Sequence, residues 1–290
     1  MIIEQAPAKV NLGLIVEGRR PDGYHDIATV FLKISLVDTL RFEAVQDEIT
    51  IHCQHPEVPG DEQNLIYRAA RALQPLAPGC GVHVEVHKQI PIAAGLGGGS
   101  SDAAATLRGL NRLWGLQLTR AELMPYAERL GADVPFFLLP DVAALGRGRG
   151  DDLTPLVCPQ PFFLALVTPP VAVSTAWVYG QFRFELTGAP KDTTILMQYL
   201  ESGDIAGLGG VCCNDLEAVV LSQFPVVGVV KQVLNQPGTY GVCMSGSGPT
   251  VYALCPSQEM AARIVKTVEP CGWPAWVCHP WQDVISDSRS

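Results

Sequence analysis

The segment from residue 91 to residue 105 holds the densest concentration of residues suited to chemistry in this chain. Its glycines and the polar residues that follow them are Gly95, Gly97, Gly98, Gly99, Ser100, Ser101 and Asp102. Glycines let a backbone turn tightly and approach a ligand closely, and serine and aspartate favour the start of a helix. The first amides of a helix have no internal partner, and the helix dipole is positive at that end. The pattern therefore predicts a phosphate-binding loop at a helix N-terminus.

The spacing excludes two better-known phosphate loops. A Walker loop ends in Gly-Lys-Ser/Thr, which is missing here, and the dinucleotide fingerprint G-x-G-x-x-G would need a glycine where Ser100 stands. A flexible turn before a core helix is the alternative interpretation. The glycine density beside two serines favours phosphate binding over that alternative.

This segment resembles the signature motif of the GHMP kinases, which include galactokinase and the homoserine, mevalonate and phosphomevalonate kinases. Other segments resemble the family in the right order along the chain, at residues 6–14, 19–26, 64–70, 131–136, 214–217 and 244–250. The triple glycine and residues 19–26 resemble the branch whose acceptor is a cytidine diphosphate-linked methylerythritol. The resemblance implies an enzyme that uses ATP to phosphorylate the 2-hydroxyl of this small molecule, a step of the non-mevalonate route to isoprenoid precursors. It also implies a two-domain α+β fold with the active site in the cleft between the domains.

The resemblance assigns a catalytic pair. Asp133 is implied as the general base and Lys9 as its cationic partner. A nearby ammonium keeps a carboxylate ionised and stabilises charge on the phosphoryl oxygens. Without the resemblance, Asp133 is more simply interpreted as a helix cap and Lys9 as a solvated strand residue.

Aromatic residues are expected to recognise the cytidine end of the acceptor. The ring of Tyr24 suits the face of a pyrimidine, and the His25 ring can form hydrogen bonds to a base edge. Tyr179, preferred over Trp177, is expected to supply a second aromatic on the other side of the base. The alternative interpretations are a surface turn for the first pair and ordinary helix packing for the second.

The remaining contacts are implied by the same resemblance. Asn11 is expected to be a polar contact to the acceptor. Gly246 and Ser247 lie in a small-residue loop that either brings amides to an acceptor phosphate or only forms a turn between strands. The residues expected to hold ATP are Asn64, Lys88, Pro91, Ala94, Gly95, Leu96, Gly97, Gly98, Gly99, Ser100 and Ser101. Mg²⁺ is expected to arrive with ATP, and no protein metal site is predicted because no carboxylate cage is visible.

These residues need strands and helices to position them. Runs of β-branched or alternating residues predict strands at 9–16, 27–36, 39–44, 50–53 and 82–87. Helical periodicity predicts helices at 64–73, 100–114 and 120–130. Strands that come first and helices that follow are typical of an α+β domain.

A turn-rich polar stretch at residues 147–155 marks the predicted boundary between an N-terminal domain (1–155) and a C-terminal domain (156–290). Its basic residues either contact a phosphate or face solvent. Beyond it, strands are predicted at 162–167, 240–244, 250–254 and 275–278, and helices from 174 and at 193–200, 215–223 and 226–234. No usable motif follows residue 259.

Composition limits the classes of partner. The net charge is −9 and the basic residues are scattered, which argues against nucleic-acid or membrane binding. Nine cysteines without a C-x-x-C pair argue against a disulfide framework or zinc site and fit a reducing compartment. With no visible signal peptide and no long apolar run, a cytoplasmic enzyme is expected. The expected state is a monomer or weak homodimer.

Two other functions stay open at this point. Another GHMP small-molecule kinase, such as homoserine or mevalonate kinase, would share the glycine loop but would need no aromatic residues for a pyrimidine. A non-catalytic nucleotide-binding module would need neither Lys9 nor Asp133.

Overall fold

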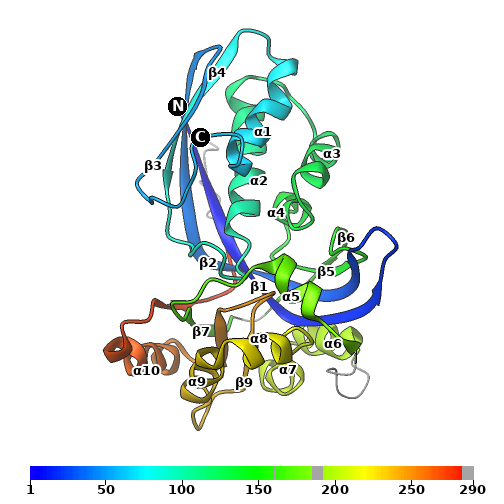
Figure 1. Cartoon of the computed structure of the whole chain (residues 1–290), viewed down its shortest axis with the longest axis vertical. Coiled ribbons are helices and arrows are strands. Elements are labelled where there is room, and N and C mark those ends of the chain that lie inside the picture. Colours follow the sequence, from blue (N-terminus) through cyan, green and yellow to red (C-terminus); the bar gives the residue numbers. More distant parts are fainter. Residues whose placement is uncertain (160, 185–191, 283–290) are drawn as a thin grey trace.

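Two long antiparallel strands, β1 (Ile2–Arg19) and β2 (His25–Gln46), run through both halves of the molecule (Figure 1). The computed structural model describes residues 1–159, 161–184 and 192–282. The prediction of two separate strands at 27–36 and 39–44 was wrong, because both belong to β2. The pairing shifts after Pro7, which faces Val37, so that Ala8 faces Ile34. Such a bulge lets a strand bend without ending.

A seven-stranded sheet is built around this pair. Its order is β3-β4-β2-β1-β8, and β5 pairs with β2 and β6. The other strands are β3 (Ile49–Cys53), β4 (Cys80–His87), β5 (Ala143–Arg147), β6 (Asp152–Leu156) and β8 (Cys213–Asn214). The helices packed against it are α1 (Leu65–Leu73), α2 (Gly98–Leu113), α3 (Arg120–Leu130) and α4 (Val134–Leu138). Ala103, Ala104, Leu107 and Leu110 are fully buried, as the apolar stripe on α2 requires.

The second half is built on a four-stranded antiparallel sheet in the order β11-β7-β10-β9. Its strands are β7 (Phe163–Val167), β9 (Gly241–Met244), β10 (Val251–Cys255) and β11 (Ala275–Cys278). Its helices are α5 (Thr175–Gln181), α6 (Thr193–Ser202), α7 (Ile205–Val211), α8 (Glu217–Gln223), α9 (Pro225–Leu234) and α10 (Gln258–Val268). Two short 3₁₀ turns lie at Gln74–Leu76 and Glu269–Cys271.

The two halves share a core. One buried cluster contains Val10 and Leu32 of the long strands together with Leu166, Leu196 and Tyr252 of the second half. β8, although it comes late in the chain, pairs in parallel with β1. The interface is therefore a packed core, and it fixes the orientation of the long strands relative to the second sheet.

The stretch at residues 147–155 is a hairpin. Its second half belongs to β6, which pairs antiparallel with β5 and extends past residue 155. The polar residues that suggested a linker are those of a tight turn in which Gly148 and Gly150 have positive φ. The domain boundary at 155/156 therefore stays a prediction, and it falls inside a strand.

Helix α10 begins at Gln258 and lies mostly beyond residue 259, where no motif was found. Ser257 caps it by accepting a hydrogen bond from the Met260 amide, and Ala261, Ile264 and Val268 form its buried stripe. Among the described residues, no single helix is long and apolar enough to cross a membrane. Only α8 and α9 taken together reach that length and hydropathy, and they are bent by 115°.

Candidate active site

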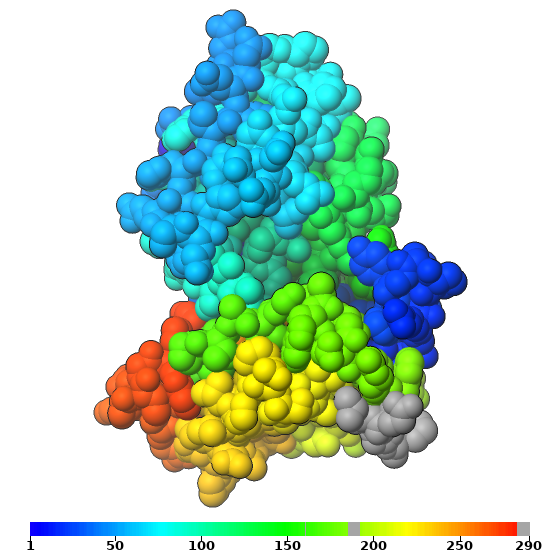
Figure 2. Space-filling model, viewed as in Figure 1, coloured from blue at the N-terminus to red at the C-terminus, as the bar shows by residue number. Residues whose placement is uncertain are grey.

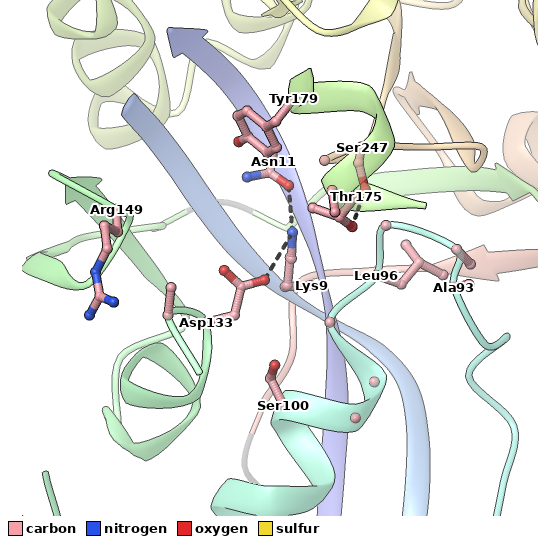
Figure 3. Close-up of a pocket in the computed structure, with 18 of the residues that line it drawn as sticks. Lys9, Asn11, Ala93, Leu96, Ser100, Asp133, Arg149, Thr175, Tyr179 and Ser247 are labelled. Atoms are coloured by element: carbon pink, nitrogen blue, oxygen red, sulfur yellow. Dashed lines mark hydrogen bonds and ion pairs between the residues drawn. The ribbon is translucent and has the colours of Figure 1, made fainter. Parts of the chain in front are cut away.

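A cavity of about 1530 Å³ opens between the first sheet with its helices and the segment around α5. The space-filling view shows the surface hollowed between these two parts (Figure 2). Every residue predicted for the site lines this cavity except Ser101. Figure 3 shows part of the lining, with Lys9, Asn11 and Asp133 close together. Ser101 is 1% exposed, and its hydroxyl has no hydrogen-bond partner in the described parts of the chain.

Lys9 and Asp133 form an ion pair inside the cavity. Lys9 Nζ lies 3.6 Å from Asp133 Oδ2, and the two side chains are 5% and 33% exposed. Lys9 is also 5.4 Å from the centre of the Phe31 ring. The buried ammonium thus has an anionic neighbour that is still open to a ligand, as a proton acceptor for an incoming hydroxyl must be.

Strand geometry positions Lys9 and Asn11 together. Residues two apart on a strand point to the same face, and Lys9 Nζ donates to Asn11 Oδ1 over 2.6 Å. Asn11 Nδ2 donates to Thr29 Oγ1 (2.7 Å), and that hydroxyl donates to the Gly13 carbonyl (2.6 Å). This chain of bonds fixes the amide orientation of Asn11 and therefore the position of the ammonium.

Asp133 occupies the residue before α4 without capping that helix. Its side chain makes no hydrogen bond to the first turn, so the helix-cap interpretation of its carboxylate is wrong. The helix begins at Val134 with Pro135 next, where a missing N–H costs nothing. Phe136 and Phe137 anchor α4 in the core and hold Asp133 at the cavity wall.

The glycine loop turns through two left-handed residues. Gly95 has φ 75° and Gly97, the residue before α2, has φ 69°. A Cβ on Gly97 would lie 3.0 Å from both Lys9 Cγ and Phe137 Cζ, so a side chain here would be strained by the backbone and crowded by both neighbours. The Lys9 amide donates to the Leu96 carbonyl over 2.9 Å. The loop is therefore fastened directly to the strand that carries Lys9.

A second loop meets the first from the other half. Ser245 Oγ donates to the Gly95 carbonyl over 2.9 Å. Asn214 Nδ2 donates to the carbonyls of Met244 (2.8 Å) and Gly246 (2.7 Å) and shapes this loop. Gly246 and Ser247 consequently face the cavity, which makes them more than a turn between strands.

Ser247 is connected to α5. Its hydroxyl lies 2.8 Å from Thr175 Oγ1, and both residues line the cavity. Sequence analysis missed Thr175 as a site residue, because threonine near a helix start is a common capping type. Only the approach of the second loop shows that its hydroxyl faces the cavity.

An aromatic cluster closes the far end of the cavity. The His25 and Tyr179 rings stack with centroids 5.3 Å apart, and Phe182 meets His25 edge-on at 5.9 Å. Trp177 packs instead against Phe224, and of the two only Tyr179 lines the cavity. Phe182 also lines the cavity but was not predicted as a site residue. The only feature of the sequence that could have indicated it is its place just after the predicted helix that contains Tyr179.

Burial shifts the pKa values of these rings. Desolvation, with the positive charge of Arg19 second, lowers the pKa of His25 and favours its neutral form. Burial, with the charge of Asp133 second, raises the pKa of Tyr179 above its usual value. The cluster therefore presents a neutral imidazole and a protonated phenol at neutral pH.

Tyr24 stands at the cavity mouth and is 58% exposed. The Arg149 guanidinium lies 5.6 Å from its ring centre and pairs with Asp151 at 2.5 Å. Of the basic residues in the 147–155 stretch, Arg149 lines the cavity, whereas Arg147 pairs with Glu17 at 3.5 Å.

Asn64 and Lys88 line the cavity while serving the fold. Asn64 caps α1: its Oδ1 accepts from the Ile66 amide (2.9 Å) and its Nδ2 donates to the Pro59 carbonyl (2.7 Å). The Lys88 ammonium bonds to two carboxylates. Burial by itself would lower the pKa of Lys88, but the charges of Asp102 and Asp38 outweigh burial and raise it.

No group of three or more His, Cys, Asp or Glu side chains that could hold a metal occurs in residues 1–159, 161–184 and 192–282. Ser100, at the start of α2, is a cavity-lining hydroxyl beside the glycine loop.

Family models match two separate parts of the chain. Residues 64–140 match the GHMP kinases N terminal domain, and residues 196–272 match the GHMP kinases C terminal domain. The first match contains the glycine loop and Asp133, and the second contains Asn214 and the Gly246–Ser247 loop.

Curated relatives match over nearly the whole chain. The chain is 43% identical over 265 residues to the 4-diphosphocytidyl-2-C-methyl-D-erythritol kinase of Exiguobacterium sibiricum, covering 91% of this chain and 92% of that protein. It is 42% identical to the enzyme of the same name from Symbiobacterium thermophilum, covering 93% and 96%.

Solved structures agree in fold. A crystal structure of 4-(cytidine 5'-diphospho)-2C-methyl-D-erythritol kinase superposes with a TM-score of 0.83 at 36% identity, over 97% of this chain and 100% of that one. Homoserine kinase from Cytophaga hutchinsonii (TM-score 0.71, 22% identity, 96% and 94% covered) shares the fold alone.

Proposed function

The chain belongs to the GHMP kinase family, among the 4-diphosphocytidyl-2-C-methyl-D-erythritol kinases, and from this premise we propose how its cavity performs the reaction. The reaction transfers the γ-phosphoryl group of ATP to the 2-hydroxyl of 4-diphosphocytidyl-2-C-methyl-D-erythritol. One observation carries the proposal: the Lys9–Asp133 pair lies in the same cavity as the glycine loop and the His25–Tyr179 stack. ATP and the pyrimidine of the acceptor can therefore bind in one connected space that also contains the carboxylate of Asp133, the proposed general base.

In this mechanism the oxygen of the acceptor hydroxyl forms a bond to the γ-phosphorus of ATP, and Asp133 accepts the proton that this hydroxyl loses. The bond between that phosphorus and the β–γ bridging oxygen breaks, and ADP leaves. Lys9, held by Asn11, offers its ammonium to the charge that spreads over the phosphoryl oxygens. Both side chains are anchored before substrate arrives, so little reorganisation is needed.

The nucleotide is assigned to the glycine loop. The amides at the start of α2, with Gly95 to Ser100 around them, would bind the phosphates. Asn64 lies at the wall of the same cavity. Mg²⁺ would be held chiefly by phosphate oxygens and water with Ser100 nearby, and it would neutralise phosphate charge.

The acceptor is assigned to the opposite end of the cavity. Tyr179 and Tyr24 offer aromatic faces for cytosine, and neutral His25 offers a ring nitrogen to the base edge. Asn11, Gly246 and Ser247 lie between this end and the glycine loop, where the erythritol and diphosphate would pass.

An ADP-release assay with Mg-ATP tests this function. The acceptors to compare are 4-diphosphocytidyl-2-C-methyl-D-erythritol, homoserine, mevalonate and galactose, with each product identified by mass. We expect turnover with the cytidyl acceptor only. Turnover with another acceptor would instead assign the chain to the branch of the family that uses that acceptor. Nucleotide binding without any turnover would indicate a non-catalytic module.

A further inference from the structure

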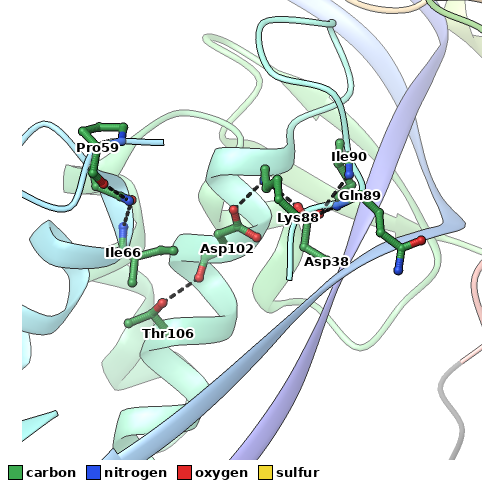
Figure 4. Close-up of polar contacts among 9 residues, drawn as sticks. Asp38, Pro59, Ile66, Lys88, Gln89, Ile90, Asp102 and Thr106 are labelled. Atoms are coloured by element: carbon green, nitrogen blue, oxygen red, sulfur yellow. Dashed lines mark hydrogen bonds and ion pairs between the residues drawn. The ribbon is translucent and has the colours of Figure 1, made fainter. Parts of the chain in front are cut away.

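Three buried charged side chains meet at the base of the glycine loop (Figure 4). Lys88 Nζ lies 2.5 Å from Asp38 Oδ2 and 2.6 Å from Asp102 Oδ2, and the side chains of Lys88, Asp38 and Asp102 are 7%, 0% and 6% exposed. Burying three charges is unfavourable unless each is paired, so removing any one leaves the others uncompensated. Such a cluster needs a reason beyond packing.

The cluster joins three elements. Asp38 belongs to β2, Lys88 follows directly after β4, and Asp102 lies near the start of α2. The glycine loop runs from the Lys88 segment to α2. One ammonium therefore ties both ends of that loop to the central sheet.

Asp38 fastens the chain that enters the loop. Its Oδ1 accepts hydrogen bonds from the amides of Gln89 (2.6 Å) and Ile90 (2.9 Å), while its Oδ2 holds Lys88. These are charge-assisted bonds in a dry environment, which are stronger than ordinary amide bonds. Asp38 is fully buried and does not line the cavity in the described parts of the molecule, whereas Lys88 and Asp102 do.

Lys88 packs closely against the first turn of α2. A Cβ placed on Gly98 would lie 3.1 Å from Lys88 Nζ and 2.9 Å from Ile90 Cγ2. The position of the Lys88 ammonium thus limits how closely the first turn of α2 can approach the Lys88 segment. The free amides of that turn are the groups assigned to the ATP phosphates. A shift of this turn would misplace those amides.

We propose that Lys88 is a positioning residue for ATP, acting through Asp38 and Asp102 to hold the glycine loop at both ends, rather than a ligand of the phosphates. The proposal rests on the assignment of ATP to this loop. Because Asp38 lies behind Lys88 and does not line the cavity, an effect of Asp38 on ATP is expected to pass through Lys88 and the loop.

A double-mutant cycle tests this role. Asp38→Asn keeps an oxygen for the two amides but places an amide donor against the Lys88 ammonium, and Lys88→Met removes the charge while keeping the side-chain length. We expect each single variant to raise the KM for ATP on the order of tenfold to 100-fold, as misplaced binding groups do, and to leave the KM for the acceptor within about twofold. We expect the double variant to resemble the worse single one, because both break the same tie.

A matched control separates positioning from stability. Lys231 Nζ pairs with Glu217 Oε2 at the same 2.5 Å distance but in the second half, so Lys231→Met should lower the melting temperature without changing the KM for ATP. If Lys88→Met alone raises the KM for ATP and Asp38→Asn does not, Lys88 is a direct ligand and the proposal fails. Additive effects in the double variant would also overturn it.

Asp102→Asn keeps the test decisive if the other variants do not fold. At pH 8 it removes one of the two ion pairs without changing shape, and we expect the KM for ATP to rise severalfold, with an unchanged KM contradicting the role. Titration of wild-type protein with ATP, without acceptor, distinguishes the two proposals. If ATP binds but no acceptor is phosphorylated, the assigned reaction is contradicted, whereas the positioning role of Lys88 is not.

Discussion

At the scale of single residues, the proposed chemistry depends on side chains that meet in one cavity. Lys9 is almost completely buried, yet it contacts the partly exposed Asp133 and the amide of Asn11. Both side chains line the cavity that we propose binds the substrates. The two predictions for single residues therefore concern different quantities: the turnover number for Asp133 and the KM for the acceptor for Tyr179.

Replacing Asp133 by Asn removes the proton acceptor while keeping the shape of the side chain. General-base catalysis typically contributes about 10²–10⁴-fold, so we expect kcat to fall by about 10³-fold with ATP affinity largely kept. Steady-state kinetics with nucleotide titration would measure both. Near-normal turnover would contradict the role of Asp133.

Tyr179 is predicted to act through its ring and not through its hydroxyl. Tyr179→Leu should raise the KM for the cytidyl acceptor about tenfold, since base stacking contributes about 1–3 kcal/mol, while Tyr179→Phe should stay close to wild type. Competition by CDP measures the same contact without turnover. Equal losses in both variants would show that the hydroxyl matters instead.

At the scale of elements, the glycine loop works because two secondary structures hold it from outside. Leu96 is bonded to β1 and Gly95 to the Ser245 hydroxyl, so the loop is confined on both sides. Its glycines are not equivalent, because only some face a close neighbour.

Gly97→Ala tests this confinement against a matched glycine. Gly97 (φ 69°) and Gly115 (φ 64°) have the same left-handed backbone, which costs roughly 1–2 kcal/mol with a Cβ, but only Gly97 has neighbours within 4 Å. Both alanine variants should lose similar stability from strain, and only Gly97→Ala should also weaken ATP binding and turnover. Equal ATP affinity in the two variants would indicate that the close approach to Lys9 is unimportant.

At the scale of the whole molecule, stability should depend on pH through Asp102. Burial, opposed by Lys88 and reinforced by Asp38, raises the pKa of Asp102 from 3.8 to about 7. Between those values the folded chain holds a proton that the unfolded chain releases, so the free energy of unfolding falls as pH rises through about 7.

Asp102→Asn removes this titration. Denaturant unfolding between pH 5 and pH 8 should show a smaller decrease in stability for the variant than for wild type, and the difference isolates Asp102 from other groups. Parallel curves for the two proteins would contradict the raised pKa.

The sequence by itself determined the family and the α+β fold, and of the residues that it predicted for the site all but Ser101 line the cavity. The glycine motif carries that information because Gly95 and Gly97 meet a local need for positive φ. The helices with regular apolar stripes, such as α2, followed from periodicity alone.

Only the tertiary structure decided how those motifs meet. Phe182 and Thr175 join the site because the α5 segment is brought against His25 of β2 and against the second loop, and no local pattern records that approach. The β5–β6 hairpin looked like a linker because its turn is polar, while its pairing with β2 is a long-range contact. Asp38 and Lys88 are 50 positions apart, and only the register of β2 and β4 puts their charges 2.5 Å from each other. Motifs of neighbouring residues can be recognised in the sequence, whereas burial and ion pairing depend on chain segments that meet only after folding.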